Sequence, residues 1–162
     1  MATIEQLSAL SAVHKVKGVL GPRQLEVRKI YLTPLAMDWM KRKLPSLQSD
    51  GHNEGAMSPK QQAYKLVKDF VAGENMFADG WGPKPLQPDD GVHGVWELRT
   101  PDWRFFGWFC RRGVFVVTAV ETKATLLRDR SYGIFRDQLV EIRNVLDLDD
   151  PKVIYGKYED VF

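Results

Sequence analysis

Cysteine and histidine are scarce in this chain of 162 residues. The single cysteine, Cys110, excludes a disulfide within the chain and any zinc site built from clustered cysteines. The three histidines, His14, His52 and His93, are too far apart in sequence to predict a metal site. We therefore expect no bound metal, and the reducing cytoplasm is the compartment that fits best.

Long apolar runs and glycine-rich phosphate loops are also missing. No apolar stretch approaches the roughly 18 residues of a membrane-spanning helix, and the first residues lack the basic start of a signal peptide. Gly80-Trp81-Gly82 has neither the spacing nor the following helix of a nucleotide-binding loop. The sequence thus predicts a cytoplasmic protein that has no membrane partner and no cofactor.

Length and composition predict a single globular domain over residues 1–162. Hydrophobic residues make up 44% and charged residues 27% of the chain, which are ordinary values, and this length suffices to bury a core. We expect residues 1–22 to add an N-terminal helix and residues 147–162 to form an acidic C-terminal tail.

The charged residues are unevenly distributed, although the net charge is only +2. Residues 94–143 carry nine Lys or Arg against six Asp or Glu, whereas residues 144–162 carry two against five. This split favours an anionic partner only weakly. It also motivates the hypothesis that the acidic tail shields the basic segment.

Local signals predict four helices and one strand outside the region 94–121. Helices begin at N-cap patterns, at Thr3, Thr33 and Ser58, or follow an apolar stripe at helical spacing. The predicted helices lie within residues 1–22 and at residues 34–44, 59–73 and 131–146, and the predicted strand covers residues 25–32. The remaining segments are a loop at 46–57, a long connection at 73–93 that is either functional or partly disordered, and a short strand or extended arm at 152–158.

A three-stranded antiparallel meander is the main feature of the sequence. Apolar residues recur at two-residue spacing in three runs, residues 94–99, 104–111 and 114–121. Thr100-Pro101-Asp102-Trp103 and Arg112-Gly113 supply the two turns. The fold class is therefore α+β, a small antiparallel sheet formed by a strand, two helices, the meander and a C-terminal helix, with the extra N-terminal helix added.

Closing both hairpins tightly fixes a register and sorts the side chains onto two faces. The expected pairs are Arg99 with Arg104, Val95 with Trp108, Arg111 with Val114, and Arg104 with Glu121. One face is almost wholly apolar and carries Trp96, Leu98, Phe105, Gly107, Phe109, Val116, Thr118 and Val120. The other face has an apolar end, with Val95, Phe106, Trp108, Phe115 and Val117, and a charged end, with Glu97, Arg99, Arg104, Glu121 and Lys123.

The charged end of the sheet is the one constellation that suggests a site, and structural interpretations compete with it. Arg99 and Arg104 are equally explained by cross-strand ion pairs with the two glutamates, and Lys123 by solvated surface. The sequence Arg128-Asp129-Arg130 fits a charged turn in which Asp129 caps the next helix. Tyr132 falls on the apolar stripe of its helix, which favours core packing.

The meander and its flanks resemble the RelE/ParE toxin superfamily, most closely its HigB-like and phage-derived members. The resemblance covers about residues 26–146. The residues that carry it are Pro85-Leu86, the run Gly94-Val95-Trp96-Glu97-Leu98-Arg99, the run Arg104-Phe105-Phe106-Gly107-Trp108-Phe109, Lys123 and, more loosely, Arg128, Arg130 and Tyr132. It implies the toxin of a toxin–antitoxin pair. RelE-like members cut mRNA on the ribosome without a metal, and ParE-like members inhibit DNA gyrase.

For an RNA-cutting member, the resemblance also implies residue roles. The ribose 2′-hydroxyl attacks the adjacent phosphate. The residues implied as catalytic are Arg104, which holds that phosphate, Lys123, which stabilises charge or assists proton transfer, Arg128, which neutralises the transition state, and Tyr132, which stacks or acts as acid or base. The residues implied as RNA-binding are Arg99 and, as an alternative to Arg128, Arg130. Trp108 is a further RNA-binding candidate from its place in the sheet, where its ring could stack on a base. Fixed cations aimed at developing charge suit phosphoryl chemistry.

The partners expected on this interpretation are mRNA on the ribosome and a cognate antitoxin protein, with a homodimer as an option. Activity as an enzyme, a metal-free endoribonuclease, is weighed against two alternatives. One is a gyrase inhibitor. The other is a non-catalytic interaction protein of phage or mobile-element origin that binds a partner through Phe106, Trp108 and Phe115.

Overall fold

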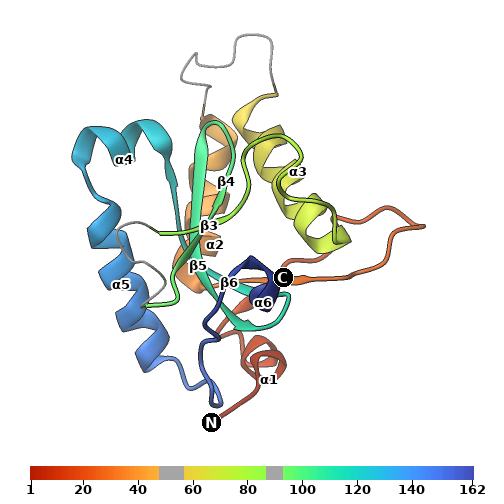
Figure 1. The fold of residues 1–162 in the computed structure, drawn as a ribbon, viewed down its shortest axis with the longest axis vertical. Helices are drawn as coiled ribbons and strands as arrows, with labels where there is room; N and C mark the ends of the chain where they lie inside the picture. The colour runs from red at the N-terminus through yellow and green to blue at the C-terminus, as the bar shows by residue number, and fades with distance from the viewer. Residues whose placement is uncertain (48–56, 87–92) are drawn as a thin grey trace.

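A six-stranded mixed sheet lies between two layers of helices in the computed structural model, which describes residues 1–47, 57–86 and 93–162 (Figure 1). The strand order is β1-β2-β6-β5-β4-β3. The strands are β1 His14–Lys15, β2 Lys29–Leu32, β3 Lys84–Pro85, β4 Trp96–Arg99, β5 Trp103–Arg111 and β6 Val114–Thr122. β2 pairs in parallel with β6, and the other neighbours pair antiparallel.

The helices cover both faces of the sheet. Within the described residues they are α1 Ile4–Ala9, α2 Pro34–Arg42, the 3-10 turn η1 Leu44–Ser46, α3 Pro59–Ala72, α4 Lys123–Asp129, α5 Tyr132–Val145 and α6 Tyr158–Val161. One hydrophobic core joins α2, α3 and α6 to the sheet, and a second joins α1, α4 and α5 to the opposite face. None of the described helices is both long and apolar enough to cross a membrane.

The predicted α+β class and the order strand, two helices, meander, helix agree with the structure, but the small antiparallel sheet does not. The sheet has six strands because two short strands, β1 and β3, extend its edges. β2 lies parallel to β6 because α2 and α3 carry the chain across the sheet before the meander begins. Strands of two residues are too short to show a periodic pattern.

The helix starts follow the predicted capping. The Thr33 hydroxyl accepts a hydrogen bond from the backbone N–H of Ala36 at the start of α2. Ser58 and Gln61 form a capping box at the start of α3, which ends at Gly73 with a φ of 80°. Such caps satisfy backbone groups that a helix end leaves unpaired, so short sequence patterns suffice to place them.

The first helix and the first long strand are both shorter than predicted. The capping box at Thr3 opens α1, but this helix ends at Ala9, and His14–Lys15 form β1 instead of a further helical turn. Here the chain pairs with the edge of β2, where its backbone gains a sheet partner. β2 begins only at Lys29, because the N–H groups of Val27 and Arg28 bond the Val71 carbonyl of α3 instead.

The predicted register is confirmed at both ends of the β5–β6 hairpin and is wrong between them. Arg111 pairs with Val114 and Arg104 with Glu121, as expected. Two β-bulges, after Phe106 and after Phe109, shift the pairing between these ends by one residue. The shift exchanges faces on β6: Phe115 and Val117 join the core under α3, and Val116 joins the core under α5.

The aromatic side chains predicted to bind a partner are interior. Phe106, Trp108 and Phe115 are fully buried, and the indole N–H of Trp108 donates to the Lys152 carbonyl at 2.8 Å. No pattern in the sequence indicates that α4, α5 and the C-terminal segment pack over Phe106 and Trp108, or that Phe115 joins the core on the opposite face. Trp108 thus presents no face to an RNA base, and the three side chains form no external docking surface.

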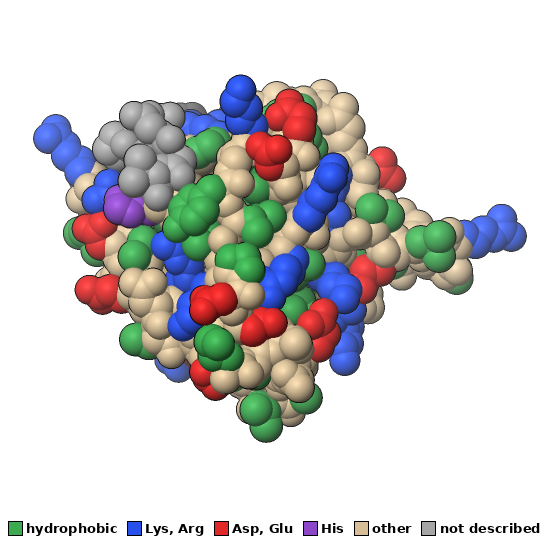
Figure 2. Space-filling view, turned by 60° about the horizontal axis from the view of Figure 1, so that its bottom comes forward, with side chains coloured by type: hydrophobic (Ala, Val, Ile, Leu, Met, Phe, Trp, Pro, Cys, Tyr) green, Lys and Arg blue, Asp and Glu red, His purple; other side chains and the backbone are tan. Residues whose placement is uncertain are grey.

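The C-terminal segment is an arm packed on the sheet and not a free acidic tail. Its Ile154 N–H bonds the Phe109 carbonyl, and the Phe162 ring lies 4.9 Å from the Phe109 ring. Asp149 forms an ion pair with Arg111 at 2.7 Å, at the hairpin end remote from Arg104. The tail therefore pairs with Arg111 of the basic segment and not with Arg104. Figure 2 shows Lys/Arg and Asp/Glu side chains interspersed on the end of the molecule that carries α1.

Parts of two predicted connections lie outside the described residues. These parts are residues 48–56 of the predicted loop 46–57 and residues 87–92 of the predicted connection 73–93. The rest of the second connection contains β3 and contributes to the site described below.

Alanine substitutions at Gly107 and at Gly133 should change the stability of the protein in opposite directions. A Cβ at Gly107 would lie 2.1 Å from the Val116 carbonyl oxygen, so Gly107→Ala should lower the free energy of unfolding by about 3 kcal/mol. Gly133 lies in α5 with open space around it, so Gly133→Ala should raise this free energy by about 0.5–1 kcal/mol. Urea denaturation measures both, and equal effects would contradict the tight approach at Gly107.

Candidate functional site

A cavity of about 370 Å³ lies at the end of the sheet where β6 leads into α4. Its lining residues are Lys84, Leu86, Glu97, Arg104, Lys123 and Tyr132. Lys84 lies in β3 and Leu86 directly after it, whereas Glu97 lies in β4 and Arg104 in β5. Lys123 and Tyr132 are the first residues of α4 and α5. Three of the lining residues, Arg104, Lys123 and Tyr132, are residues that the sequence predicted as catalytic. We call this space the Arg104 cavity.

The strand register and two helix starts bring these residues together. Lys84 pairs directly with Glu97 across β3 and β4, and Arg104 lies on the next strand. Thr122 caps α4 by accepting a hydrogen bond from the Thr125 N–H at 3.1 Å, which places Lys123 immediately beyond the end of β6. Tyr132 opens α5 on the same side of the sheet.

Arg104 is a buried and rigidly held cation. Its side chain is only 5% exposed, and one guanidinium nitrogen, Nη1, donates to the carbonyl oxygens of Thr100 and Trp103 at 2.5 and 2.7 Å. The Trp81 ring lies 5.6 Å from the Arg104 guanidinium carbon and 5.8 Å from Lys123 Nζ. Trp81 therefore covers both cations with its π face, which favours positive charge.

Glu97 places a desolvated carboxyl group among these cations. Its residue is 1% exposed, Oε1 lies 3.4 Å from Lys84 Nζ, and Oε2 lies 4.0 Å from Arg104 Nε. Oε2 has no hydrogen-bond partner among the described residues. Burial raises the pKa of Glu97 above its usual range, and the positive charges of Arg104 and Lys84 oppose that rise.

Tyr132 adds a second titratable group to the Arg104 cavity. Its ring contacts the Phe106 ring edge-on at 5.9 Å, so the ring is partly in the core, as its place on the apolar stripe suggested. Burial is the main reason that the pKa of the Tyr132 phenol is raised, and nearby Glu97 adds to the rise. Together these residues form a pocket that can hold an anion between cations and exchange protons with it.

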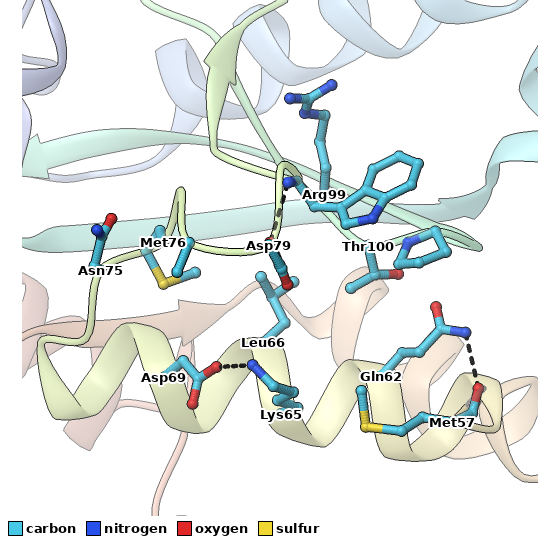
Figure 3. A pocket seen from close by; sticks show the side chains of 13 residues that line it. Met57, Gln62, Lys65, Leu66, Asp69, Asn75, Met76, Asp79, Arg99 and Thr100 are labelled. Atoms are coloured by element: carbon cyan, nitrogen blue, oxygen red, sulfur yellow. Dashed lines mark hydrogen bonds and ion pairs between the residues drawn. The ribbon is translucent and has the colours of Figure 1, made fainter. Parts of the chain in front are cut away.

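Arg99 pairs with Arg104 in the register but does not line the Arg104 cavity. Its Nε donates to the Gly82 carbonyl at 2.8 Å. It borders a smaller pocket of about 80 Å³ between α3 and residues 75–81, and Figure 3 shows its guanidinium pointing away from α3. Of the three cations expected at the charged end of the sheet, Arg104 and Lys123 therefore line the cavity, and Arg99 lies beside it.

Arg128 and Arg130 lie outside the lining of the Arg104 cavity. Arg128 is exposed at the end of α4 and forms an ion pair with Asp129 at 2.7 Å. Arg130 is also exposed, and its φ of 50° ends that helix. The expectation that Asp129 caps the next helix is wrong, because Ser131 occupies the N-cap position of α5.

Sequence reasoning missed Trp81, Lys84 and the buried state of Glu97. Trp81 and Lys84 belong to the long glycine- and proline-rich connection, which has no periodicity, and its unusual length was the one signal available. Glu97 was interpreted as a surface ion-pair partner because nothing in the sequence shows that β3 and α5 cover it.

A scan against protein-family models, a search of the curated proteins and a search of the solved structures each found no match for this chain. The resemblance to RelE/ParE toxins therefore remains a prediction from sequence motifs. Function has to be argued from the cavity itself.

The raised pKa of Glu97 predicts a specific pH dependence of stability. Between its usual value of 4.5 and the higher folded-state pKa, the folded chain retains a proton that the unfolded chain has lost. The free energy of unfolding of the wild type, relative to Glu97→Gln, should therefore fall as pH rises through this window and become constant above it.

Urea denaturation of both chains from pH 4 to pH 8 measures this difference. Glu141→Gln is the matched control, because it removes a glutamate at an exposed position on α5 and should not reproduce this pH-dependent difference. A difference between wild type and Glu97→Gln that rises with pH would mean that ion pairing outweighs burial at Glu97.

Proposed function

We propose that this protein is an RNA-cutting toxin of the RelE/HigB type, acting as a metal-free endoribonuclease on mRNA. The observation that carries the proposal is that one cavity contains both the cations to bind a phosphate and the two groups to move protons. The cations are Lys84, Arg104 and Lys123, and the proton-transfer groups are Glu97 and Tyr132. The order of elements expected from the resemblance also supports it.

The scissile phosphate binds between the cations of the Arg104 cavity. Lys84 and Lys123 are half-exposed and can reach an incoming strand, whereas Arg104 is held at the back by its backbone contacts. Three cations face one carboxylate, so the cavity keeps an excess of positive charge. Rigid cations stabilise developing negative charge well because they need no reorganisation during the reaction.

Glu97 and Tyr132 transfer the protons. Glu97 accepts the proton of the ribose 2′-hydroxyl, the 2′-oxygen forms a bond to phosphorus, and the bond to the 5′-oxygen breaks. Tyr132 donates its phenolic proton to that leaving oxygen, and Lys123 stabilises the charge on the phosphate oxygens. The raised pKa of Glu97 makes it a stronger base. The Tyr132 phenol, whose pKa is also raised, is protonated at neutral pH and is still a stronger acid than the alcohol that leaves.

The products are a 2′,3′-cyclic phosphate and a 5′-hydroxyl. Arg128 and Arg130 have no part in this step, and Arg99 contributes at most a flanking contact. An antitoxin that neutralises the protein would need to block access to the Arg104 cavity.

Three single substitutions in the cavity should each slow RNA cutting strongly without unfolding the chain. Lys123→Ala removes a half-exposed cation and should slow cleavage by about 100-fold or more. Glu97→Gln and Tyr132→Phe keep the side-chain shape, and each removes one proton-transfer group. Each should therefore slow cleavage by about 100-fold or more. Lys41→Ala, at an exposed position on α2 outside the cavity lining, should cut as fast as wild type.

The assay adds purified chain to a defined mRNA, either free in the presence of a chelator or on programmed ribosomes in a buffer with Mg²⁺, and identifies the new RNA ends. Induction in a bacterial host is the parallel test and should give growth arrest with cleaved transcripts. Arrest with intact mRNA and damaged DNA would instead identify a gyrase inhibitor. Normal growth at good expression would argue against both toxin activities and for a non-catalytic interaction protein.

A further inference from the structure

A second cavity, of about 360 Å³, opens on the opposite face of the sheet, between the sheet, α2 and α3. Its floor consists of core side chains from four strands. These are Ile30, Leu98, Phe105 and Val117, each at most 2% exposed. Volume and lining both fall in the range of binding pockets for small apolar ligands. We call this space the apolar cavity.

The walls of the apolar cavity are also apolar, and one of them is an irregular segment of chain. Met37 and Met40 of α2 contribute flexible thioethers, which adapt readily to a ligand. Val16 and Val19, after β1, form the other side, where the Tyr64 hydroxyl of α3 donates to the Val19 carbonyl at 3.2 Å. This hydrogen bond ties the segment to α3, so the wall that it forms is fixed in place.

The polar groups at the rim are cationic. Lys15, Lys17 and Lys60 line the cavity, and its lining includes no Asp or Glu. Lys15 is already bonded to Glu26 at 2.7 Å, whereas Lys17 and Lys60 are exposed. A deep apolar space beneath two solvent-facing lysines is complementary to a molecule with one apolar chain and one anionic end.

We propose that the apolar cavity binds a single-chain amphiphile with an anionic head, of the size of a fatty acid of about twelve carbons. The apolar chain of the ligand lies against Leu98 and Phe105 and supplies the dispersion contacts that an unfilled apolar space lacks. The head group lies at the rim, between Lys17 and Lys60. This inference is independent of RNA cleavage, because the apolar cavity and the Arg104 cavity share no lining residue.

Calorimetric titration of the full chain tests the proposal with defined probes. Dodecanoate should bind one per chain, and affinity should rise about fourfold for each methylene added from octanoate to dodecanoate. Dodecanol, which has the same chain and no charge, should bind about tenfold more weakly than dodecanoate.

Two sets of variants locate the binding. Lys17→Glu/Lys60→Glu should raise the Kd of dodecanoate at least tenfold and leave that of dodecanol unchanged, whereas Lys41→Glu/Lys157→Glu, at exposed sites outside the lining, should change neither. Ala63→Phe adds bulk inside the cavity and should reduce binding of both probes, with folding checked by circular dichroism.

Three results would overturn the proposal. They are no binding of dodecanoate, unchanged binding in a folded Ala63→Phe, and equal affinity for dodecanol and dodecanoate. Loss of RNA cleavage has no bearing on these outcomes, so failure of one proposal leaves the other intact.

Discussion

The pairing of β5 with β6 is the constraint on which the rest of the structure depends. β5 is buried along nearly its whole length, because helices cover both of its faces and strands flank both of its edges. Its two bulges allow Arg104 to stay opposite Glu121 at one end while Phe109 faces Phe115 near the other. A strand buried on both sides accepts only one register, since a slip of one residue would move every side chain to the wrong face.

The Arg104 cavity owes its chemical character to burial as much as to charge. An arginine on an open strand would be hydrated and mobile, whereas Arg104 is bound to its own turn and covered by Trp81. The same enclosure withdraws water from Glu97 and leaves one of its carboxyl oxygens without a partner among the described residues. Fixed positive charge beside a carboxyl group that water does not solvate is an arrangement suited to proton transfer.

Sequence patterns predicted what short-range physics determines and failed where distant segments decide the outcome. The caps at Thr33 and Ser58 and the meeting of Arg104 with Lys123 follow from local rules, namely N-cap hydrogen bonding and hairpin closure. The bulges were not placed from the sequence: Gly107, at the first of them, is a residue type that marks a bulge inside a strand, whereas no residue marks the second. The enclosure of Glu97 depends on Lys84 of β3, which lies in a segment without periodicity, and on α5, whose docking no local pattern specifies.

Neighbouring residues on β4 and β5 point to opposite sides of the sheet. Glu97 and Arg104 face one cavity, and Leu98 and Phe105, the next residues in the chain, face the other. The two chambers are therefore separated by a wall whose thickness is a single layer of backbone. Leu98 and Glu97 are joined by one peptide unit, so a ligand that shifted the backbone at Leu98 would also move the backbone of Glu97 on the other side of the sheet.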